Sequence, residues 1–547
     1  MKKKITLAII VLCTSVMNNI MAQQPNMVKD IAVGSAYSSP SNLLNVNGIL
    51  FFGAADGING NELWKSDGTA AGTVLVKDIY QGSNGSYPNT MTNVNGVLYF
   101  MATTSLGNKL WKSDGTSAGT VMVKDIFPGN SSSSSDPMYL TNVNGTLFFS
   151  ADDGINGVEL WKSDGTSGGT VIVKDIRLGY NSSGPCYFAA IGGTLFFSAN
   201  DSINGVELWK SDGTTAGTVM VKNIEPGNYS SAPGLLTNVN GALFFVPLYG
   251  SYACELYKSD GSDAGTALVK DIYPGGGYSY PSKLTNVNGI LFFTADDGSN
   301  GTELWKSDGT ESGTVMVKDI KPGNSDANPS QITNVNGMVF FIADDGVHGV
   351  ELWKSDGTPT GTILVKDIKS GNNSSTPNNL TNLNGKLYFT ADDGTNGVEL
   401  WKSDGTDTGT VMVKNIYPGS SSSSPLYLTD VNGNLFFSAN DGIYGIELWA
   451  LNFSSGVEQL NEVDNTLNLF PNPTNRTTTI EYILPNDARK GSIDLYDLNG
   501  KLIKSYLIDN TFQNIVIDNS EIPSGTYIYC LKAADKILDS RQIIIAK

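Results

Sequence analysis

The sequence contains very few of the residues that most enzymes use for catalysis. Its 547 residues include one histidine, His348, and four cysteines. His348 stands in a loop between two expected strands, without the partners of a Ser-His-Asp or Cys-His arrangement, and a zinc site would lack nitrogen ligands. The sequence therefore favours a non-enzymatic protein in which His348 is an exposed turn residue.

Positive charge is also scarce. The chain has 35 Lys and Arg residues against 53 Asp and Glu residues, a net charge of -18 and a pI of about 4.5. Nucleic acid and anionic membrane surfaces would be repelled, so the sequence predicts no nucleic-acid partner. The acidic residues recur with each repeat described below and do not form an acidic tail.

The N-terminal apolar run, residues 5–16, is too short to span a bilayer. Three lysines precede this run and Met21-Ala22 follows it, which is typical of a secretory signal peptide over residues 1–22. Lipidation of Cys13 is disfavoured because Leu12 is larger than the small residue expected before a lipidated cysteine. We therefore expect an exported protein with no transmembrane segment.

Cysteine is too rare for a disulfide framework. Once the signal peptide is removed, Cys186, Cys254 and Cys530 remain, an odd number for an exported chain. The sequence neither predicts nor excludes a single disulfide bond between Cys186 and Cys254.

What the sequence does contain is a repeat. The stretch from Glu159 to Thr166, ELWKSDGT, returns with little change along most of the chain. Its tryptophan recurs at spacings of 47, 50 and then 48 residues, with one tyrosine in the series: Trp64, Trp111, Trp161, Trp209, Tyr257, Trp305, Trp353, Trp401 and Trp449. Such a period indicates stacked copies of one supersecondary unit. In each copy, Asp164 and Gly165 or their equivalents are expected to form a turn, with Gly165 in a left-handed conformation.

Each copy contains four strand signals, expected in the third copy over 139–143, 146–150, 158–162 and 170–176. The second is apolar without alternation, which predicts a sheet covered on both faces. Four short antiparallel strands per radial unit favour a β-propeller over a β-solenoid. Nine blades are predicted, with the N-terminal strand 27–31 completing the last blade and closing the ring.

The predicted domain boundaries follow from where the repeat stops. After the signal peptide at 1–22, the propeller is expected over 23–450, a polar linker over 451–466 and a C-terminal domain over 467–547. Seven short strands in this last region suit an immunoglobulin-like β-sandwich.

The loop between the second and third strands carries paired acidic residues in several copies. Oxygen ligands without histidine suit calcium, although the spacing is not that of an EF-hand and turn chemistry explains the same residues. Calcium is the one candidate cofactor, and the candidate ligands are Asp152, Asp153, Asp296, Asp297, Asp344, Asp345, Asp392 and Asp393.

Blades two and five depart from the repeat in this loop, and tyrosines gather there and in the connections between blades. Exposed tyrosines can stack on sugar rings and donate hydrogen bonds, although packing can also account for them. The candidate ligand-binding residues are Tyr180, Tyr187, Tyr229, Tyr249, Tyr252, Tyr278 and Tyr280.

The C-terminal region contains a motif whose residues are Pro471, Asn472, Pro473, Gly500, Gly525 and Tyr527. By this motif, the region from 467 to 547 resembles the C-terminal sorting domain of type IX secretion cargo in the Bacteroidetes. The resemblance implies export across the outer membrane by the type IX secretion machinery, and removal of the domain by a sortase with surface attachment. The repeat over 27–450 similarly resembles the family named for its ELWxxDGT motif, which implies no particular activity.

The sequence thus predicts a secreted or surface-attached, non-enzymatic β-propeller that recognises a glycan or an extracellular protein. Two alternatives remain open: a polysaccharide hydrolase or lyase with carboxylates near the axis, and a purely structural surface protein. The fold and the localisation of a protein do not by themselves define its function.

Overall fold

The computed structural model describes residues 24–129, 133–250, 254–452, 467–471, 473–484, 490–497, 501–509, 511, 514–533 and 536–547. The predicted signal peptide and residues 453–466 of the predicted linker lie outside these ranges. The chain divides into two compact units, Met1–Phe453 and Ser454–Lys547. Every regular element of the described residues is a β-strand. Among them, no helix has the length and apolar character needed to cross a membrane.

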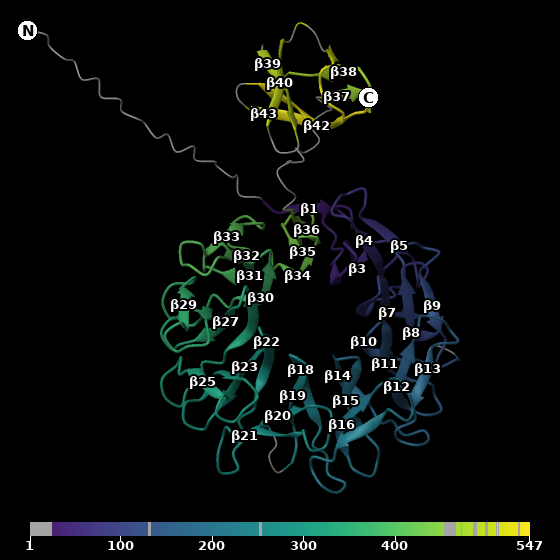
Figure 1. Ribbon diagram of the computed structural model, residues 1–547, viewed down its shortest axis with the longest axis vertical. Coiled ribbons are helices and arrows are strands. Elements are labelled where there is room, and N and C mark those ends of the chain that lie inside the picture. The colour runs from purple at the N-terminus through teal and green to yellow at the C-terminus, as the bar shows by residue number, and fades with distance from the viewer. Residues whose placement is uncertain are drawn as a thin grey trace, which may run out of the picture. The chain divides into compact units, whose positions relative to one another are not determined.

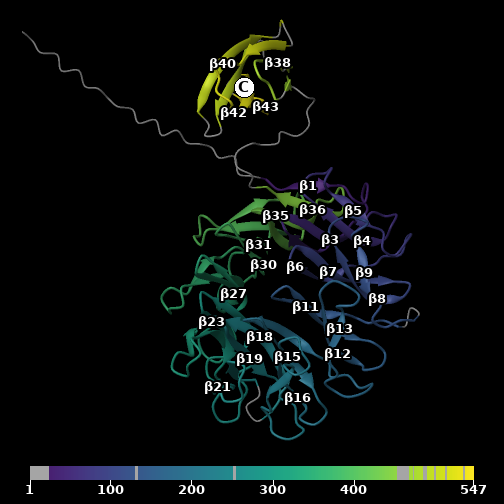
Figure 2. The ribbon, with the colours of Figure 1, turned by 45° about the vertical axis from the view of Figure 1, so that its right-hand side comes forward.

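The described part of the first unit forms nine four-stranded antiparallel sheets arranged as blades around one axis (Figure 1; oblique view in Figure 2). Blade 1 consists of β2 to β5, each following blade takes the next four strands, and blade 9 contains β34, β35, β36 and β1. Within the first unit, the all-β fold and the nine predicted blades are therefore present.

The first strands of the blades are β2 Ser41–Val46, β6 Asn89–Val94, β10 Met138–Val143, β14 Cys186–Ile191, β18 Pro233–Val239, β22 Ser282–Val287, β26 Ser330–Val335, β30 Asn378–Leu383 and β34 Leu426–Val431. The second strands are β3 Ile49–Ala55, β7 Val97–Thr104, β11 Thr146–Asp152, β15 Thr194–Asn200, β19 Ala242–Pro247, β23 Ile290–Asp296, β27 Met338–Asp344, β31 Lys386–Asp392 and β35 Asn434–Asn440.

The third strands are β4 Asn61–Ser66, β8 Gly107–Ser113, β12 Val158–Ser163, β16 Val206–Ser211, β20 Leu256–Ser259, β24 Thr302–Ser307, β28 Val350–Ser355, β32 Val398–Ser403 and β36 Ile446–Leu451. The fourth strands are β5 Val74–Lys77, β9 Val121–Lys124, β13 Val171–Lys174, β17 Val219–Lys222, β21 Ala267–Lys270, β25 Val315–Lys318, β29 Ile363–Lys366, β33 Val411–Lys414 and, from the N-terminus, β1 Asn26–Lys29.

The apolar second strand of each blade is covered on both faces, as its sequence predicts. Phe149 packs with Val94 and Leu110 of the preceding blade, whereas Phe148 packs with Leu195 and Phe197 of the following one. Alternate side chains of a strand point to opposite faces, so each blade contributes to two cores. First strands of neighbouring blades contact one another and lie nearest the axis (Figure 1).

The N-terminal strand lies in the last blade. β1 pairs antiparallel with β36, with Met27 opposite Trp449, and spans 26–29 where 27–31 is predicted. Ile31 enters a core that also contains Leu50 of blade 1 and Leu448 of blade 9. β36 extends to Leu451, which is buried.

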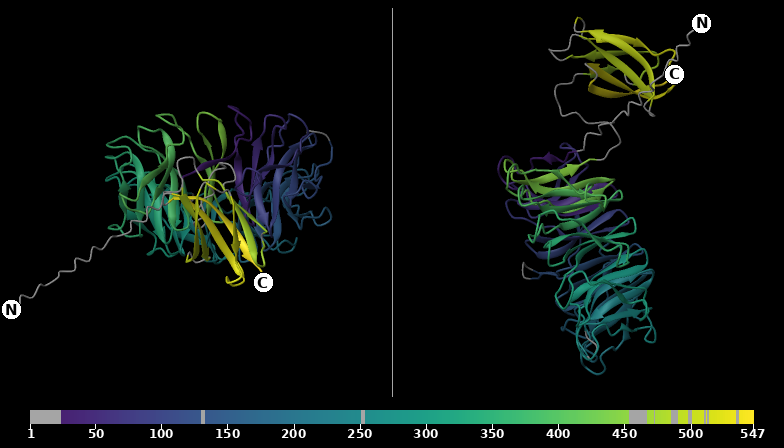
Figure 3. Two further views of the ribbon diagram at one scale, coloured as in Figure 1. Left: turned by 90° about the horizontal axis from the view of Figure 1, so that it is seen from above. Right: turned by 90° about the vertical axis from the view of Figure 1, so that its left-hand side faces the viewer.

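The second unit contains a three-stranded sheet, in the order β37-β38-β41, and a four-stranded sheet, in the order β40-β39-β42-β43 (Figure 3). The strands are β37 Leu467–Phe470, β38 Thr477–Tyr482, β39 Lys490–Asp497, β40 Leu502–Asp509, β41 Asn514–Asp518, β42 Gly525–Ala533 and β43 Lys536–Ile545. Both sheets contribute to one core, so the unit is a β-sandwich. The described residues of this unit contain the seven short strands that the sequence predicts.

Candidate functional site

The Ser-Asp-Gly-Thr segment of the repeat is a self-contained turn. Asp164 Oδ1 accepts hydrogen bonds from the N–H and the hydroxyl of Thr166, both at 2.8 Å. Ser163 Oγ lies 2.8 Å from Thr170 Oγ1 and accepts the Gly165 N–H at 2.9 Å. Gly165 has a φ of 88°. The predicted structural role of Asp164 and Gly165 is confirmed.

The lysines and the tryptophan of the repeat connect neighbouring blades. Lys162 Nζ donates to Gly213 O at 2.8 Å, and Lys174 Nζ donates to Thr218 O at 2.8 Å. Lys174 Nζ also lies 5.7 Å from the ring centre of Trp209, within range of a cation–π interaction. These side chains are therefore used by the architecture itself.

The glutamate of the repeat is buried and holds the connection to the next blade. Glu159 accepts hydrogen bonds from the Ile176 N–H at 3.0 Å, the Ser183 N–H at 2.9 Å and the Ser183 hydroxyl at 2.6 Å. Burial raises the pKa of Glu159, and these hydrogen bonds lower it by less. Seven blades repeat the Glu-to-Ser hydroxyl contact, and the glutamates are Glu62, Glu159, Glu207, Glu255, Glu351, Glu399 and Glu447.

Glu303 of blade 6 lacks this serine because Ala327 takes its place. Burial raises the pKa of Glu303 to about 7. The unfolded chain releases this proton near pH 4.5, so the stabilising effect of protonation is complete below pH 4.5 and is lost as pH rises through about 7. We expect Ala327→Ser to supply the hydroxyl, lower the pKa and stabilise the protein by about 1 to 2 kcal/mol above pH 7.

Denaturant unfolding of wild-type protein and the Ala327→Ser variant at pH 5 and pH 8 tests this expectation. The gain should be larger at pH 8 than at pH 5. The matched control is Ser183→Ala, which removes the same hydroxyl from Glu159 and should lower stability most at pH 8. An equal effect of Ala327→Ser at both pH values would contradict the assignment to Glu303.

In blade 2, the position of the buried glutamate carries a cation instead. Lys109 stands where the other blades have glutamate, and its side chain is fully buried. Its Nζ donates to Asp125 Oδ1 at 2.5 Å, Phe127 O at 2.6 Å and Ser133 O at 2.8 Å. The connection after blade 2 thus presents acceptors where the others present N–H donors.

The acidic loops proposed for calcium are tight turns. Asp153 Oδ1 accepts the N–H groups of Ile155 and Asn156 at 2.8 and 2.7 Å, and Oδ2 accepts the Asn156 side-chain amide at 2.7 Å. Partial burial raises the pKa of Asp153, but these bonds outweigh it and hold the pKa below its usual value. Asp152 Oδ1 accepts the Gly154 N–H at 2.7 Å.

The equivalent residues behave in the same way. Asp297, Asp345 and Asp393 accept the corresponding N–H groups, and Asp296, Asp344 and Asp392 accept a glycine N–H. Lysines add ion pairs to Asp344 and Asp392, from Lys321 at 2.7 Å and from Lys369 at 2.6 Å. The described residues contain no group of three or more His, Cys, Asp or Glu side chains arranged for a metal. Calcium binding by these loops stays a prediction.

His348 closes one of these turns. Its Nδ1 lies 2.8 Å from Asp345 Oδ2, in the place that asparagine takes in other blades. The hydrogen bond with Asp345 raises the pKa of His348. His348 is a turn residue, as interpreted, but it is half-buried, with 36% of its side chain exposed.

The six candidate tyrosines among the described residues are exposed, and ring contact between two of them is limited to Tyr278 and Tyr280. Tyr180, Tyr229 and Tyr249 lie in loops, each with more than 60% of its surface exposed. Tyr278 and Tyr280 contact each other edge to face, with ring centres 5.8 Å apart. The remaining candidates are Tyr187, on β14, and Tyr252, which lies outside the described residues.

The bridge that the sequence left open is not formed. Cys186, Cys254 and Cys530 are free thiols.

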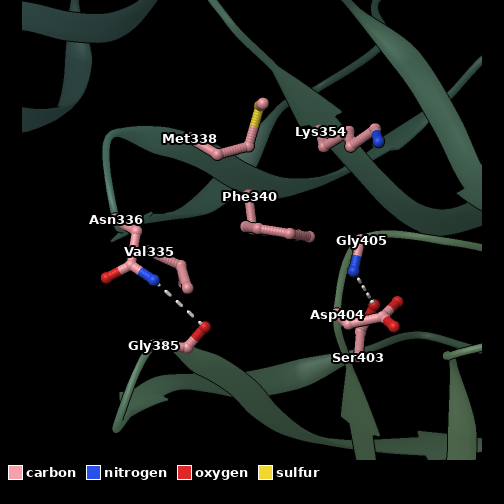
Figure 4. A pocket seen from close by; sticks show the side chains of 9 residues that line it. All are labelled: Val335, Asn336, Met338, Phe340, Lys354, Gly385, Ser403, Asp404 and Gly405. Atoms are coloured by element: carbon pink, nitrogen blue, oxygen red, sulfur yellow. Dashed lines mark hydrogen bonds between the residues drawn. The ribbon is translucent and has the colours of Figure 1, made fainter.

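A small cavity of about 200 Å³ lies between blades 7 and 8, beside Phe340 and Asp404 (Figure 4). Across it, the Asn336 side-chain amide donates to Gly385 O at 3.3 Å. The same crevice recurs between blades 1 and 2, beside Phe51 and Asp114. Because it repeats with the blades, this cavity is a feature of blade packing.

Of one further set of surface residues, the sequence analysis selected only Tyr187. The second residue of the first strand in eight blades, and the third in blade 5, has a left-handed backbone with φ between 48° and 58°. These nine residues, here called the inner rim, are Asn42, Thr90, Tyr139, Tyr187, Leu235, Lys283, Gln331, Asn379 and Tyr427. A proline stands two residues earlier in all nine copies. The signal in the sequence was this constant proline beside a position that changes from copy to copy.

The sorting motif of the second unit is partly described. Pro471 and Pro473 are exposed, and Thr474 after them binds the last strand through the Ile544 carbonyl at 2.8 Å. Gly525 pairs with Ile545, and the Tyr527 hydroxyl donates to Pro523 O at 3.1 Å. Asn472 and Gly500 lie outside the described residues.

Solved structures with likeness to the chain include a puromycin hydrolase, a prolyl oligopeptidase and the β-propeller domain of a protease. A puromycin hydrolase is 13% identical, with 64% of this chain and 58% of that chain covered and a TM-score of 0.33. Prolyl oligopeptidase B from Galerina marginata is 11% identical, with 75% and 56% covered and a TM-score of 0.38. The β-propeller domain of the Trilobed protease from Pyrococcus furiosus is 10% identical, with 69% and 98% covered and a TM-score of 0.34.

The chain spans between 54% and 61% of the first three solved chains that it matches. No curated protein matches it. Residues 468–546 match the family model of the secretion system C-terminal sorting domain. The chain therefore carries a type IX sorting domain and is exported to the cell surface or beyond.

Proposed function

We propose that the propeller is a non-enzymatic recognition module that presents its loops to a glycan or protein outside the cell. The observation that carries this proposal is a set of apolar side chains at one loop position. Ile58, Ile155, Ile203, Val347 and Ile443 occupy equivalent sites in the loop between second and third strands, and each is more than 60% exposed. Single exposed apolar residues are ordinary, but their repetition at one position supports a contact surface.

Export supports the same proposal. A protein carried by type IX secretion meets its partner outside the cell, and the sorting domain is proposed to be removed by a sortase that attaches the propeller to the surface. An acidic protein of net charge -18 would approach a neutral or basic partner most readily. Glycans and extracellular proteins both meet this condition.

The hydrolase or lyase alternative requires carboxylates that stand apart from the repeat. The acidic side chains described above recur from blade to blade in turns or in buried structural sites. This repetition supports recognition over catalysis.

A broad glycan array probed with the mature chain tests the proposal, in calcium and in a chelator. Specific binding with no release of reducing sugar is the expected result. Dependence on calcium would assign a second role to the acidic loops. Turnover that is lost on changing one or two carboxylates would replace the proposal by the enzymatic alternative. Folded protein that binds neither glycans nor extracellular proteins would favour a purely structural role.

A further inference from the structure

The inner rim combines a fixed backbone with variable side chains. A left-handed backbone is least costly for glycine and asparagine. The rim contains no glycine and only two asparagines, Asn42 and Asn379, although all nine residues adopt this conformation. The other seven retain tyrosine, leucine, lysine, glutamine or threonine against the backbone preference. The strained backbone conformation is the same in all nine blades, whereas the residue type changes from blade to blade. This combination indicates that the side chains have a use.

At three rim positions the side chain contacts the following blade. Asn42 donates to Pro88 O at 3.0 Å, and Asn379 donates to Pro425 O at 3.3 Å. Tyr139 stacks on Phe188 of blade 4, with ring centres 5.6 Å apart and planes inclined by 30°. At these three contacts, the rim is continuous between neighbouring blades.

Blades 3 and 4 form an aromatic sector of this rim. Tyr139 and Tyr187 are each 42% exposed. The Tyr187 ring lies beside Gly234, and a Cβ added there would be 3.7 Å from Tyr187 Cζ. Gly234 directly precedes the rim residue of blade 5. It is the only glycine among the nine residues that directly precede a rim residue. The Leu248 side chain comes nearer still, with its Cδ1 3.4 Å from the same point, so Tyr187 and Leu248 both border the backbone of Gly234.

The chemistry of the rim fits a sugar better than an acidic polymer or an apolar peptide. None of its nine residues is acidic, whereas the chain as a whole carries a net charge of -18. Half-exposed tyrosines offer flat faces and hydroxyl groups, and amides stand at three other rim positions. The two cavities described above lie at the C-terminal ends of the first strands, whereas the rim lies at their N-terminal ends. Neither cavity therefore gives the rim a pocket for an apolar side chain.

We infer that the part of the inner rim in blades 3 and 4 is the carbohydrate-contacting surface of the propeller, with Tyr139 and Tyr187 as the stacking platform for a neutral oligosaccharide. This inference rests on the proposed recognition function and names its site and ligand class. Stacking of a pyranose ring on each tyrosine places adjacent sugar units over adjacent blades. Specificity then depends on rim residues that differ between blades and not on the repeat signature.

The experiment changes both tyrosines to the residue that blades 1 and 8 already have there. Tyr139→Asn with Tyr187→Asn should retain the backbone, because Asn42 and Asn379 adopt it. Calorimetric titration of the mature full chain with cellohexaose, mannohexaose, laminarihexaose and xylohexaose should reveal binding of at least one. The double variant should bind that sugar at least about tenfold more weakly.

The matched control is Tyr427→Asn, the same change at the same rim position in blade 9. It should alter the affinity by less than about twofold, a difference too small for a lost stacking contact. Sugar binding that survives in the double variant but is lost in a Tyr180→Ala and Tyr229→Ala variant would overturn the rim assignment and leave the proposed function standing. No binding to any of the four sugars would overturn the inference. Failure on the broad array as well would overturn the proposed function.

Titration with a dodecapeptide rich in leucine and phenylalanine separates the two ligand classes. Weak or absent peptide binding supports the sugar assignment. Peptide binding that depends on Tyr139 and Tyr187, without sugar binding, would overturn it. Circular dichroism and thermal melting of each variant confirm that it is folded.

Discussion

Replacing Lys109 by glutamate, the residue that the other blades have at this position, will destabilise the propeller by about 3 to 5 kcal/mol. The ammonium group is buried among Asp125 Oδ1, Phe127 O and Ser133 O, all of which are acceptors. A carboxylate in their midst would be unpaired, desolvated and repelled by Asp125. The expected effect is notable because substitution toward the repeat consensus ordinarily stabilises a protein.

Thermal and denaturant unfolding of the full mature chain measure this effect. Lys109→Met is the matched control, since it fills a similar volume without adding a negative charge and should cost less than the glutamate. Adding Asp125→Asn to Lys109→Glu should recover part of the loss by removing the repulsion. A Lys109→Glu variant as stable as the wild type would mean that the connection after blade 2 can adopt the arrangement of the other blades.

Removal of the N-terminal strand will lower the stability of the propeller by about 5 kcal/mol or more. A chain that begins at Val33 loses the buried Ile31, worth roughly 1.5 to 3 kcal/mol, together with the partly buried Met27 and Val28, which contribute less. It also leaves Glu447 without the Ile31 and Ala32 N–H groups and exposes the edge of β36. Exposed strand edges favour association, so aggregation should accompany the loss.

A peptide of residues 24–32 added in trans provides the decisive control. It should raise the melting temperature of the truncated chain in a concentration-dependent manner, because it binds the folded state. The same peptide with Val28→Asp and Ile31→Asp should not. A truncated chain that melts like the wild type would show that β1 contributes little to the last blade.

The blade pattern could be predicted because its signals are local and repeated. Asn-Gly and Asp-Gly turns, the unbroken apolar run of Leu147, Phe148 and Phe149, and the interrupted N- and C-terminal copies led to nine four-stranded sheets. The ends of elements were less accurate: the fourth strand of blade 3 is Val171–Lys174 where 170–176 was predicted. The glutamate hydrogen bonds to Ile176 and Ser183 take the chain out of the sheet there.

The candidate site could be predicted less well. Tyr187 was selected from the sequence, but Tyr139 and the seven other rim positions were not, because a left-handed residue in a strand has no signature when its identity varies. The acidic loops were selected for their composition, and the structure uses their oxygens for turn hydrogen bonds. Composition identifies the groups that are present but not the partners that occupy them.

The sequence by itself determined the period of the repeat, the strand order within each blade and the export that the sorting domain directs. These properties depend on residues close together in the chain or on a motif that is read directly. The tertiary structure alone decided which side chains remain free. Lys174 binds Thr218 in the next blade, and Glu447 binds Ser38 across the join between the two ends of the propeller. Contacts between residues so far apart depend on how the blades are packed, and only the side chains that they leave unused are available to a ligand.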